Sequence, residues 1–395
     1  MIIRCKNIYA EDGVMDGYMV VEGSKIKAIS AKQEDLAADI DVGEAKIIPG
    51  IFDTHNHGIY GYHVAISVPD VELELKGYLK GLAAQGVTSV LPTDDSGVFA
   101  DLARLAREPQ DGAKIIGIHS EGPYLNRSGE NGGEDPHPDV DMEFVRKMVE
   151  DSDGMLKLVA LAPEIPGTDE VIAYLLARDI RVAFAHSNDD YYQTMEAFNK
   201  GLTVATHTAN VMSGIHHRRM GGLGACLLND DVWCEVICDG MHVSNVMLKL
   251  MFKVKSYDKF LMVSDTSVTS GAPTGRYVYY TDGSAVNVKE DGFCLSDSGR
   301  LCCSTKPVLY GMGNLVKNVS IPLETVVRMA SLNPAICYGV ADTKGSIKVG
   351  KDADFVVIDE DFNALQTYSE GRKVYDHEVD HDPFNPVFIK NHMVK

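Results

Sequence analysis

The sequence predicts an α/β fold: a (β/α)8 TIM barrel with a small β-sandwich domain formed by both chain termini. Three observations lead to this prediction. Eight short, apolar, β-rich runs recur along the chain, and most of them end in polar residues that can bind a metal. Segments with helical periodicity lie between many of these runs, and this alternation is typical of a parallel sheet. Both ends of the chain instead alternate short strands with glycine turns.

The barrel strands are expected in the following order along the chain: residues 45–52, 86–91, 114–118, 156–161, 181–185, 203–206, 233–238 and 260–263. Helical patterns between them cover residues 71–85, 99–107, 142–149, 168–178, 191–199 and 245–254. Eight strands with intervening helices imply a closed barrel.

The domain boundaries follow from these elements. Residues 49–340 are expected to form the barrel, and residues 1–48 and 341–395 are expected to form one discontinuous β-sandwich domain. Between the eighth strand and the sandwich, residues 276–288 and 292–295 indicate a hairpin insert. Residues 306–317 and 323–329 indicate helices that close the barrel.

Composition limits the class of partner. The 395 residues include 37 Lys and Arg against 57 Asp and Glu, a net charge of −20, which argues against nucleic acid or anionic membranes as partners. No apolar stretch reaches the ~18–20 residues that span a bilayer. The first residues lack the pattern of a signal peptide, so a cytoplasmic location is expected. The eight cysteines lack zinc-knuckle spacing and are expected to be mostly buried thiols.

Residues that can bind a metal gather after the predicted strands. They are His55, His57, Glu121, His186, His207, His242 and Asp265. The carboxyl ends of barrel strands converge on one face, so these side chains are expected to meet there. A single histidine at a strand end is more often structural, but several on different strands favour a divalent metal site with mixed imidazole and carboxylate ligands. Zinc is the first candidate.

Such a metal would lower the pKa of a bound water from ~15.7 towards ~7, and a carboxylate would then carry the proton. Asp265, the last of the set, is the residue expected to do so.

The order and spacing of several motifs carry a family resemblance. They are PGIFDTHNHG (49–58), VTSVLPT (87–93), GIHSEGPYLN (117–126), LAPE (161–164), AHSN (185–188), ATH with Asn210 (205–210), DGMH (239–242), VSD (263–265), SLNPA (331–335) and GKDADFVVID (350–359). From residue 48 to about residue 373 the chain resembles the amidohydrolase superfamily and, within it, the N-acetylglucosamine-6-phosphate deacetylases.

This resemblance implies a role for each matched metal-binding residue. Glu121, His186 and His207 would hold the principal metal, and His55 with His57 would allow a second, so that each subunit binds one or two zinc ions. Asp265 would accept a proton from the metal-bound water as it attacks the acetamide carbonyl. It would then protonate the departing amine.

The resemblance also implies a phosphate site and a homodimer. Arg218 and His242 match the family's phosphate contacts, and Asn210 with Val211 match the position of a contributing backbone amide. In the family the arginine comes from a neighbouring subunit, so Arg218 would be lent across a dimer interface. Arg218 lies in the most basic tetrad of an acidic chain, although an exposed surface turn remains the alternative interpretation of residues 216–219.

Departures from the family pattern bear on the substrate. The side chain that helps to polarise the acetyl carbonyl is missing from the loop after Glu121, and we hypothesise that His137 replaces it; a surface histidine is the alternative. Leu301, Cys302 and Cys303 lie beside the expected sugar site, where thiols stand in place of the usual alanine and glycine. The tail from residue 377 extends beyond the resemblance.

The expected function is therefore metal-dependent deacetylation of an N-acetylhexosamine 6-phosphate, first of all N-acetylglucosamine 6-phosphate, to acetate and the amino-sugar phosphate. The alternatives are a paralog that acts on N-acetylgalactosamine 6-phosphate, another acylated amine or a cyclic amide. A non-catalytic assembly protein is less favoured, because such a protein should have lost metal ligands. A lysine-dependent aldolase or an isomerase is disfavoured because no lysine ends a predicted strand.

Overall fold

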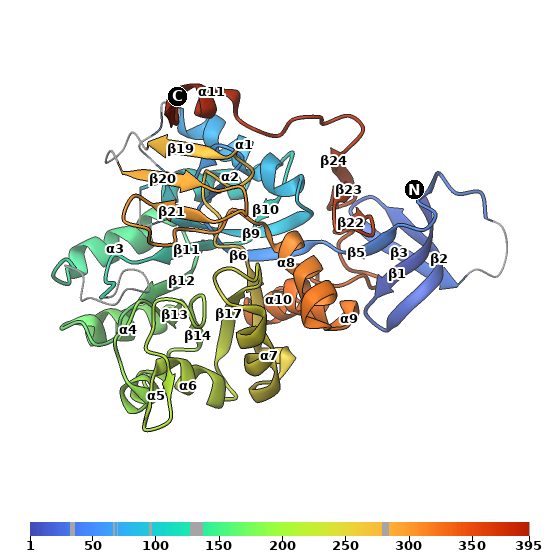
Figure 1. Cartoon of the computed structure of the whole chain (residues 1–395). Coiled ribbons are helices and arrows are strands. Elements are labelled where there is room, and N and C mark those ends of the chain that lie inside the picture. Colours follow the sequence, from blue (N-terminus) through green and yellow to red (C-terminus); the bar gives the residue numbers. More distant parts are fainter. Residues whose placement is uncertain are drawn as a thin grey trace.

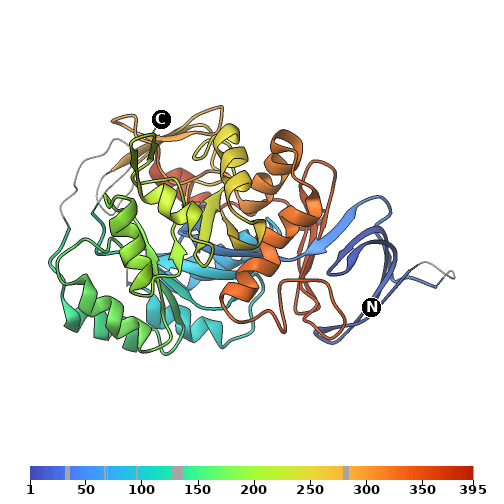
Figure 2. The same cartoon turned by 90° about the horizontal axis from the view of Figure 1, so that it is seen from below.

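A computed structural model describes residues 1–394 except 32–35, 66–67, 69, 95–96, 127–136 and 279–283. It consists of a barrel surrounded by helices and a β domain at one side, to which the N-terminus belongs (Figure 1). Figure 2 shows the same arrangement from below, with the N-terminal strands projecting away from the barrel. The predicted fold class is confirmed.

Eight parallel strands form the barrel: β6 (Ile51–Asn56), β9 (Val87–Asp94), β11 (Ile118–Glu121), β12 (Leu156–Leu161), β13 (Arg181–Phe184), β14 (Val204–Ala205), β17 (Trp233–Ile237) and β18 (Phe260–Val263). Each pairs with the next from β6 through β18. The short strand β10 (Lys114–Ile115) also pairs with β9, so the predicted third strand is interrupted before β11.

The barrel closes between β18 and β6 at its carboxyl end. The Asp265 backbone N–H donates to the His55 carbonyl at 3.0 Å, and the His57 N–H donates to the Thr266 carbonyl at 2.9 Å. The contacts that close the barrel therefore also bring the first predicted metal-binding residues next to the last one.

The helices are α1 (Val71–Ala83), α2 (Phe99–Ala106), α3 (Met142–Asp151), α4 (Thr168–Leu176), α5 (Tyr191–Asn199), α6 (Gly222–Leu228) and α7 (Asn245–Val254) around the barrel, with the 3-10 turn η1 (Tyr257–Lys259). Asp70, Asp141, Asp190 and Ser244 cap α1, α3, α5 and α7 by accepting backbone N–H groups. The glycine-rich α6 was not predicted, because Gly222–Leu228 lacks both a polar face and a side-chain cap.

Closing helices follow as α8 (Val308–Asn314), η2 (Leu315–Val319), α9 (Leu323–Val327), η3 (Arg328–Leu332) and α10 (Asn333–Cys337). None of the helices in the described part of the chain is long and apolar enough to cross a membrane.

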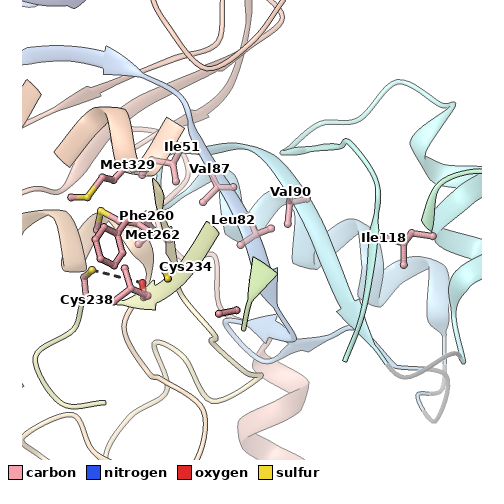
Figure 3. Packing of buried hydrophobic residues seen from close by; sticks show 14 of the residues in the cluster. Ile51, Leu82, Val87, Val90, Ile118, Cys234, Cys238, Phe260, Met262 and Met329 are labelled. Carbon is pink, nitrogen blue, oxygen red and sulfur yellow. Dashed lines mark hydrogen bonds between the residues drawn. The ribbon is translucent and has the colours of Figure 1, made fainter. Parts of the chain in front are cut away.

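Alternate strand residues face two different apolar clusters. Ile51, Val87 and Val90 pack against the outer helices, together with Leu82 of α1 and Met329 of η3 (Figure 3). The neighbouring Phe52 belongs instead to a smaller cluster. In β13, Val182 and Phe184 likewise belong to the larger cluster and Ala183 to the smaller one. This period of two is what a parallel strand buried on both faces requires.

The β domain contains strands from both ends of the chain. β1 (Ile2–Ala10), β2 (Gly13–Glu22), β3 (Lys25–Ala31), β4 (Ile40–Asp41) and β5 (Lys46–Pro49) join β22 (Phe355–Ile358), β23 (Ala364–Ser369) and β24 (Arg372–Asp376). The order is β24-β23-β22-β5-β1-β2-β3, with β4 also beside β1. Both halves of this continuous ladder contribute to one apolar core, which includes Ile3, Met19 and Phe355.

The predicted first strand, residues 45–52, is two strands. β5 pairs with β22 in the β domain, whereas β6 pairs with β9 in the barrel. Gly50 separates them, and a Cβ there would lie 2.1 Å from the Thr88 hydroxyl oxygen, so the crossing point requires glycine.

The C-terminal tail also differs from the expectation that residues 341–395 all belong to the β domain. After β24 the chain returns to the barrel, where α11 (Pro386–His392) and β25 (Met393–Val394) follow. β25 pairs with β19 (Gly275–Val278), which forms an antiparallel sheet with β20 (Ala285–Val288) and β21 (Cys294–Ser296). Phe388 of α11 packs in the core of this insert, and this apolar contact attaches the tail there.

The smallest strand pairs are β7 (Gly58–Ile59) with β8 (Tyr62–His63), and β15 (Ile215–His216) with β16 (Arg219–Met220).

Candidate metal centre and substrate cavity

Two groups of side chains that could hold a metal ion share one carboxylate at the carboxyl end of the barrel. Glu121 Oε1 lies 3.2 Å from His186 Nε2 and 3.0 Å from His207 Nε2. Its other oxygen, Oε2, lies 3.1 Å from His57 Nε2 and 3.4 Å from His55 Nε2. Within each group of three the donor atoms lie within 4.8 Å of one another. Glu121 thus belongs to both groups.

Asp265 faces the second group. Its Oδ1 lies 3.4 Å from His57 Nε2 and 3.6 Å from His55 Nε2. Burial alone would raise the pKa of Asp265, but the two imidazoles lower it to about 2. Asp265 is therefore ionised at neutral pH.

The electrostatics of the cluster favour a positive ion. Burial disfavours charge on the His57 ring, yet the Asp265 and Glu121 carboxylates raise its pKa to about 9. Burial would likewise raise the pKa of Glu121, whereas the surrounding imidazoles hold it well below its usual range. Two carboxylates thus stabilise positive charge where the imidazole nitrogens converge, and this donor set fits a divalent cation.

Three of these residues have a backbone conformation that is energetically unfavourable for residues other than glycine. His186, His207 and Asp265 each follow a barrel strand at positive φ, with values of 45°, 29° and 49°. Such conformations cost on the order of 1–3 kcal/mol in non-glycine residues and concentrate at functional sites. The chain leaves each strand by a turn that directs the side chain across the barrel mouth.

A buried polar layer lies beneath the His55–His57 pair. Glu235, in the middle of β17, is fully buried, and its Oε2 lies 3.2 Å from His55 Nδ1. Its Oε1 accepts a hydrogen bond from the Thr54 hydroxyl at 3.0 Å. His119 lies in the same layer and donates from Nδ1 to the Thr54 carbonyl at 3.1 Å. Burial and the neighbouring His55 charge hold the pKa of His119 well below its usual range, so the ring is neutral.

A cavity of about 230 Å³ opens above the donor cluster. The predicted residues that line it are His57, Glu121, His186, His207, Asn210, Val211, His242, Asp265, Leu301, Cys302 and Cys303. His55 is fully buried beneath them.

His242 brings a positive charge to this cavity. Its Nδ1 lies 2.7 Å from Asp239 Oδ2, and its Nε2 donates to the Cys302 carbonyl at 2.8 Å. Burial lowers the pKa of this ring, but the Asp239 carboxylate outweighs burial and raises the pKa to about 9. The His242 imidazolium therefore forms an ion pair with Asp239 at the wall of the cavity.

Besides His55, two predicted residues do not line the cavity. Arg218 lies in the exposed turn between β15 and β16 and is not among the residues that line the cavity of its own chain. His137 places its Nδ1 3.1 Å from the Pro138 carbonyl. Most of the loop before it, residues 127–136, lies outside the described residues.

Three site residues were missed by sequence reasoning: Glu235, His119 and Arg300, the last of which also lines the cavity. A single carboxylate within the apolar run of residues 233–238 was an available signal for Glu235. No comparable signal existed for Arg300, which follows a turn in the insert.

Mixed imidazole and carboxylate donors at the carboxyl end of a (β/α)8 barrel are typical of a metal-dependent enzyme. A sequence profile of the amidohydrolase family matches residues 47–375. The chain therefore belongs to the amidohydrolase family.

The names of individual relatives describe a more specific activity than the family name does. An N-acetylglucosamine-6-phosphate deacetylase of Vibrio furnissii is 33% identical over 368 residues, which cover 90% of each chain. An N-acetylgalactosamine-6-phosphate deacetylase of Escherichia coli O157:H7 is 31% identical and covers 94% of this chain and 98% of its own. The structure of a mutant N-acetyl-D-glucosamine-6-phosphate deacetylase of Mycobacterium smegmatis with N-acetyl-D-glucosamine-6-phosphate superposes with a TM-score of 0.83. It is 26% identical, and the match covers 95% of this chain and 99% of that one.

Proposed function

We propose that this protein removes the acetyl group from N-acetylglucosamine 6-phosphate, giving acetate and glucosamine 6-phosphate. The observation that carries the proposal is the Glu121-centred donor cluster with Asp265 beside it, below a cavity that also holds the His242 imidazolium. The deacetylase names of the relatives support the same reaction.

We propose that Glu121, His186 and His207 hold the principal metal and that His55 and His57 hold a second. Zinc is our choice of ion, because imidazole and carboxylate ligands suit it. When bound, such an ion supplies Lewis-acid chemistry, which lowers the pKa of a water ligand and polarises a carbonyl oxygen.

Asp265 is the proposed proton carrier. Its ionised Oδ1 accepts a proton from water as the water oxygen attacks the acetamide carbonyl carbon. The same oxygen then delivers that proton to the amine nitrogen as the C–N bond breaks. For Asp265→Asn we expect kcat to fall by about 10²–10⁴-fold, because general acid–base catalysis contributes that much.

The substrate's phosphate is assigned to the positive groups at the cavity. His242 and, from a second copy of the chain, Arg218 are the proposed contacts, with a backbone amide at Asn210 or Val211. We also propose that Leu301, Cys302 and Cys303 contact the sugar, since all three line the cavity. The hypothesis that His137 polarises the acetyl carbonyl stays a prediction, and unchanged deacetylation by His137→Ala would contradict it.

N-acetylgalactosamine 6-phosphate is the second candidate substrate, since one 31% identical relative is named for it. The test is amine release from both sugar phosphates and from their unphosphorylated forms, together with metal analysis. We expect the phosphorylated sugars to react far faster. Equal rates without phosphate would contradict the phosphate assignment, and full activity without metal would contradict the mechanism.

A further inference from the structure

Three thiols lie together at one wall of the cavity. Cys302 and Cys303 line it, and Cys294 is 2% exposed behind Cys302. Of the eight cysteines, only Cys302 and Cys303 are partly exposed. The proposed deacetylation has no step that requires a thiol, so this group of residues needs its own explanation.

Cys294 and Cys302 face each other across an antiparallel turn of the insert. The Cys302 N–H donates to the Cys294 carbonyl at 2.8 Å, and the next pair inward, Leu295 with Leu301, forms a β-bridge. Cys302 Sγ lies 3.7 Å from the Arg300 carbonyl oxygen, and Cys294 Sγ lies 3.7 Å from the Thr269 hydroxyl oxygen. Directly opposite residues in such a ladder have Cα atoms ~4.5–5.5 Å apart, and a disulfide requires ~4.4–6.8 Å.

The surroundings make Cys302 the reactive member of the group. The neighbouring Cys294 thiol has the largest influence on the Cys302 thiol and, with the positive charges of Arg300 and His242, lowers the pKa of Cys302 to about 7. Cys303 differs, because desolvation and the Asp265 and Glu121 carboxylates raise its pKa well above the usual value. The thiolate is the nucleophilic form, so Cys302 reacts first.

We propose that Cys294 and Cys302 are a redox-active thiol pair in the wall of the cavity, which a small-molecule disulfide oxidises to an intramolecular disulfide. The Cys302 thiolate attacks one sulfur of the small disulfide and releases one thiolate, leaving a mixed disulfide. The Cys294 thiol then gives its proton to the thiolate released in the first step, and its sulfur attacks the Cys302 sulfur and releases the second thiolate. The pair loses two electrons, and the small disulfide gains them.

Oxidation of Cys302 would affect the substrate cavity through His242, because the Cys302 carbonyl accepts the hydrogen bond from His242 Nε2. A new bond at Cys302 would shift this carbonyl and the imidazolium that it holds. This consequence rests on the proposed function, whereas the disulfide itself does not. In the reducing cytoplasm expected from the sequence, the resting form is the dithiol.

The chemical test uses the metal-loaded protein and oxidised glutathione. After incubation and removal of the glutathione, thiols are counted in denaturant, and disulfide-linked peptides are identified by mass spectrometry. We expect two fewer thiols than the eight of the reduced chain, a peptide pair joining Cys294 to Cys302, and reversal by dithiothreitol. Eight remaining thiols, a stable mixed disulfide, or a Cys302–Cys303 bond would overturn the proposal.

Cys294→Ala is the matched variant, because it removes the buried partner and leaves Cys302 in the cavity. It should retain basal deacetylation and form only the mixed disulfide with glutathione.

In the wild type we expect kcat/KM to fall by about 10- to 100-fold with the time course of disulfide formation, as a displacement of ~1 Å can cost that much. A disulfide that forms without loss of activity would contradict the proposed effect of oxidation on deacetylation. Cys302→Ala, which should lose no thiols on treatment, provides a second check.

Discussion

Glu235 shows how a buried side chain can set the geometry of a site that it does not line. Its carboxylate lies at His55 Nδ1, so the opposite nitrogen of that ring, Nε2, is the one directed to Glu121 and Asp265. A carboxylate behind a ligating histidine fixes the orientation of the ring and increases its basicity. Glu235 is thus expected to act as a positioning residue for the His55–His57 pair.

Glu235→Gln should weaken binding of the second metal. The substitution keeps the shape and removes the negative charge, so we expect affinity there to fall about 10- to 100-fold. Metal content per subunit, measured after dialysis against increasing chelator, checks this without an assay of activity. Thr54→Val removes only the other hydrogen bond of Glu235 and should keep both metals. Wild-type metal retention by Glu235→Gln would contradict the positioning role.

For single residues, the position along a strand decides whether the sequence can identify them as site residues. His186, His207 and Asp265 were recognisable because each directly follows an apolar run, where parallel strands converge. Glu235 and His119 point into the barrel from within their strands, and their role depends on which side chains meet across the interior. That packing is not contained in the local pattern.

The segments that bracket the barrel are joined by an ion cluster. Glu11 follows β1, and its N–H donates to the Ile347 carbonyl at 3.0 Å. Its carboxylate lies 2.6 Å from Lys348 Nζ and 3.2 Å from Lys351 Nζ. Partial burial would raise the pKa of Glu11, but these lysines and Ser346 lower it to about 2 from the usual 4.5.

This shift predicts how stability depends on pH. A lowered carboxyl pKa means that the stabilisation is complete above pH 4.5 and is lost as pH falls towards 2. Glu11→Gln should therefore lower the free energy of unfolding by about 1–2 kcal/mol at pH 7, and the difference from wild type should shrink below pH 4.5. Urea unfolding at several pH values measures it. Glu44→Gln, in an exposed pair with Lys6, is the control and should change little. A pH-independent difference would contradict this role of the Glu11 charge.

Element boundaries were less predictable than element types. Residues 45–52 form one continuous β pattern, and only the pairing of β5 with β22 and of β6 with β9 divides them at Gly50. The sequence of the C-terminal tail likewise did not indicate where the tail packs. Its strand β25 pairs with the insert, which lies more than a hundred residues earlier in the chain. Long-range pairing determines both cases.

At the scale of the whole molecule, the proposed phosphate site could take Arg218 from its own chain or from a second copy, and the position of the basic turn (residues 216–219) bears on this choice. Residues 214–220 are all exposed, and Ile215 and Met220, at 45% and 37% exposure, flank the basic tetrad. An exposed hairpin with apolar flanks and a cationic tip suits insertion into a second copy of the chain. The sequence indicated Arg218 by resemblance, but it could not show that the turn lies outside its own cavity.

A mixed dimer tests whether Arg218 is lent. Two differently tagged chains, one with Arg218→Ala and one with Asp265→Asn, are co-expressed, and the dimer that carries both tags is purified. If each cavity takes Arg218 from its partner, the Arg218→Ala chain has its own Asp265 and a borrowed arginine, so one complete site forms. Deacetylation should then reach about half of the wild-type rate, since one of two sites is intact. If Arg218 serves its own chain, neither site is complete and the mixed dimer is as inactive as its parents. The parent proteins are the controls, and size-exclusion chromatography first tests whether the chain is a dimer.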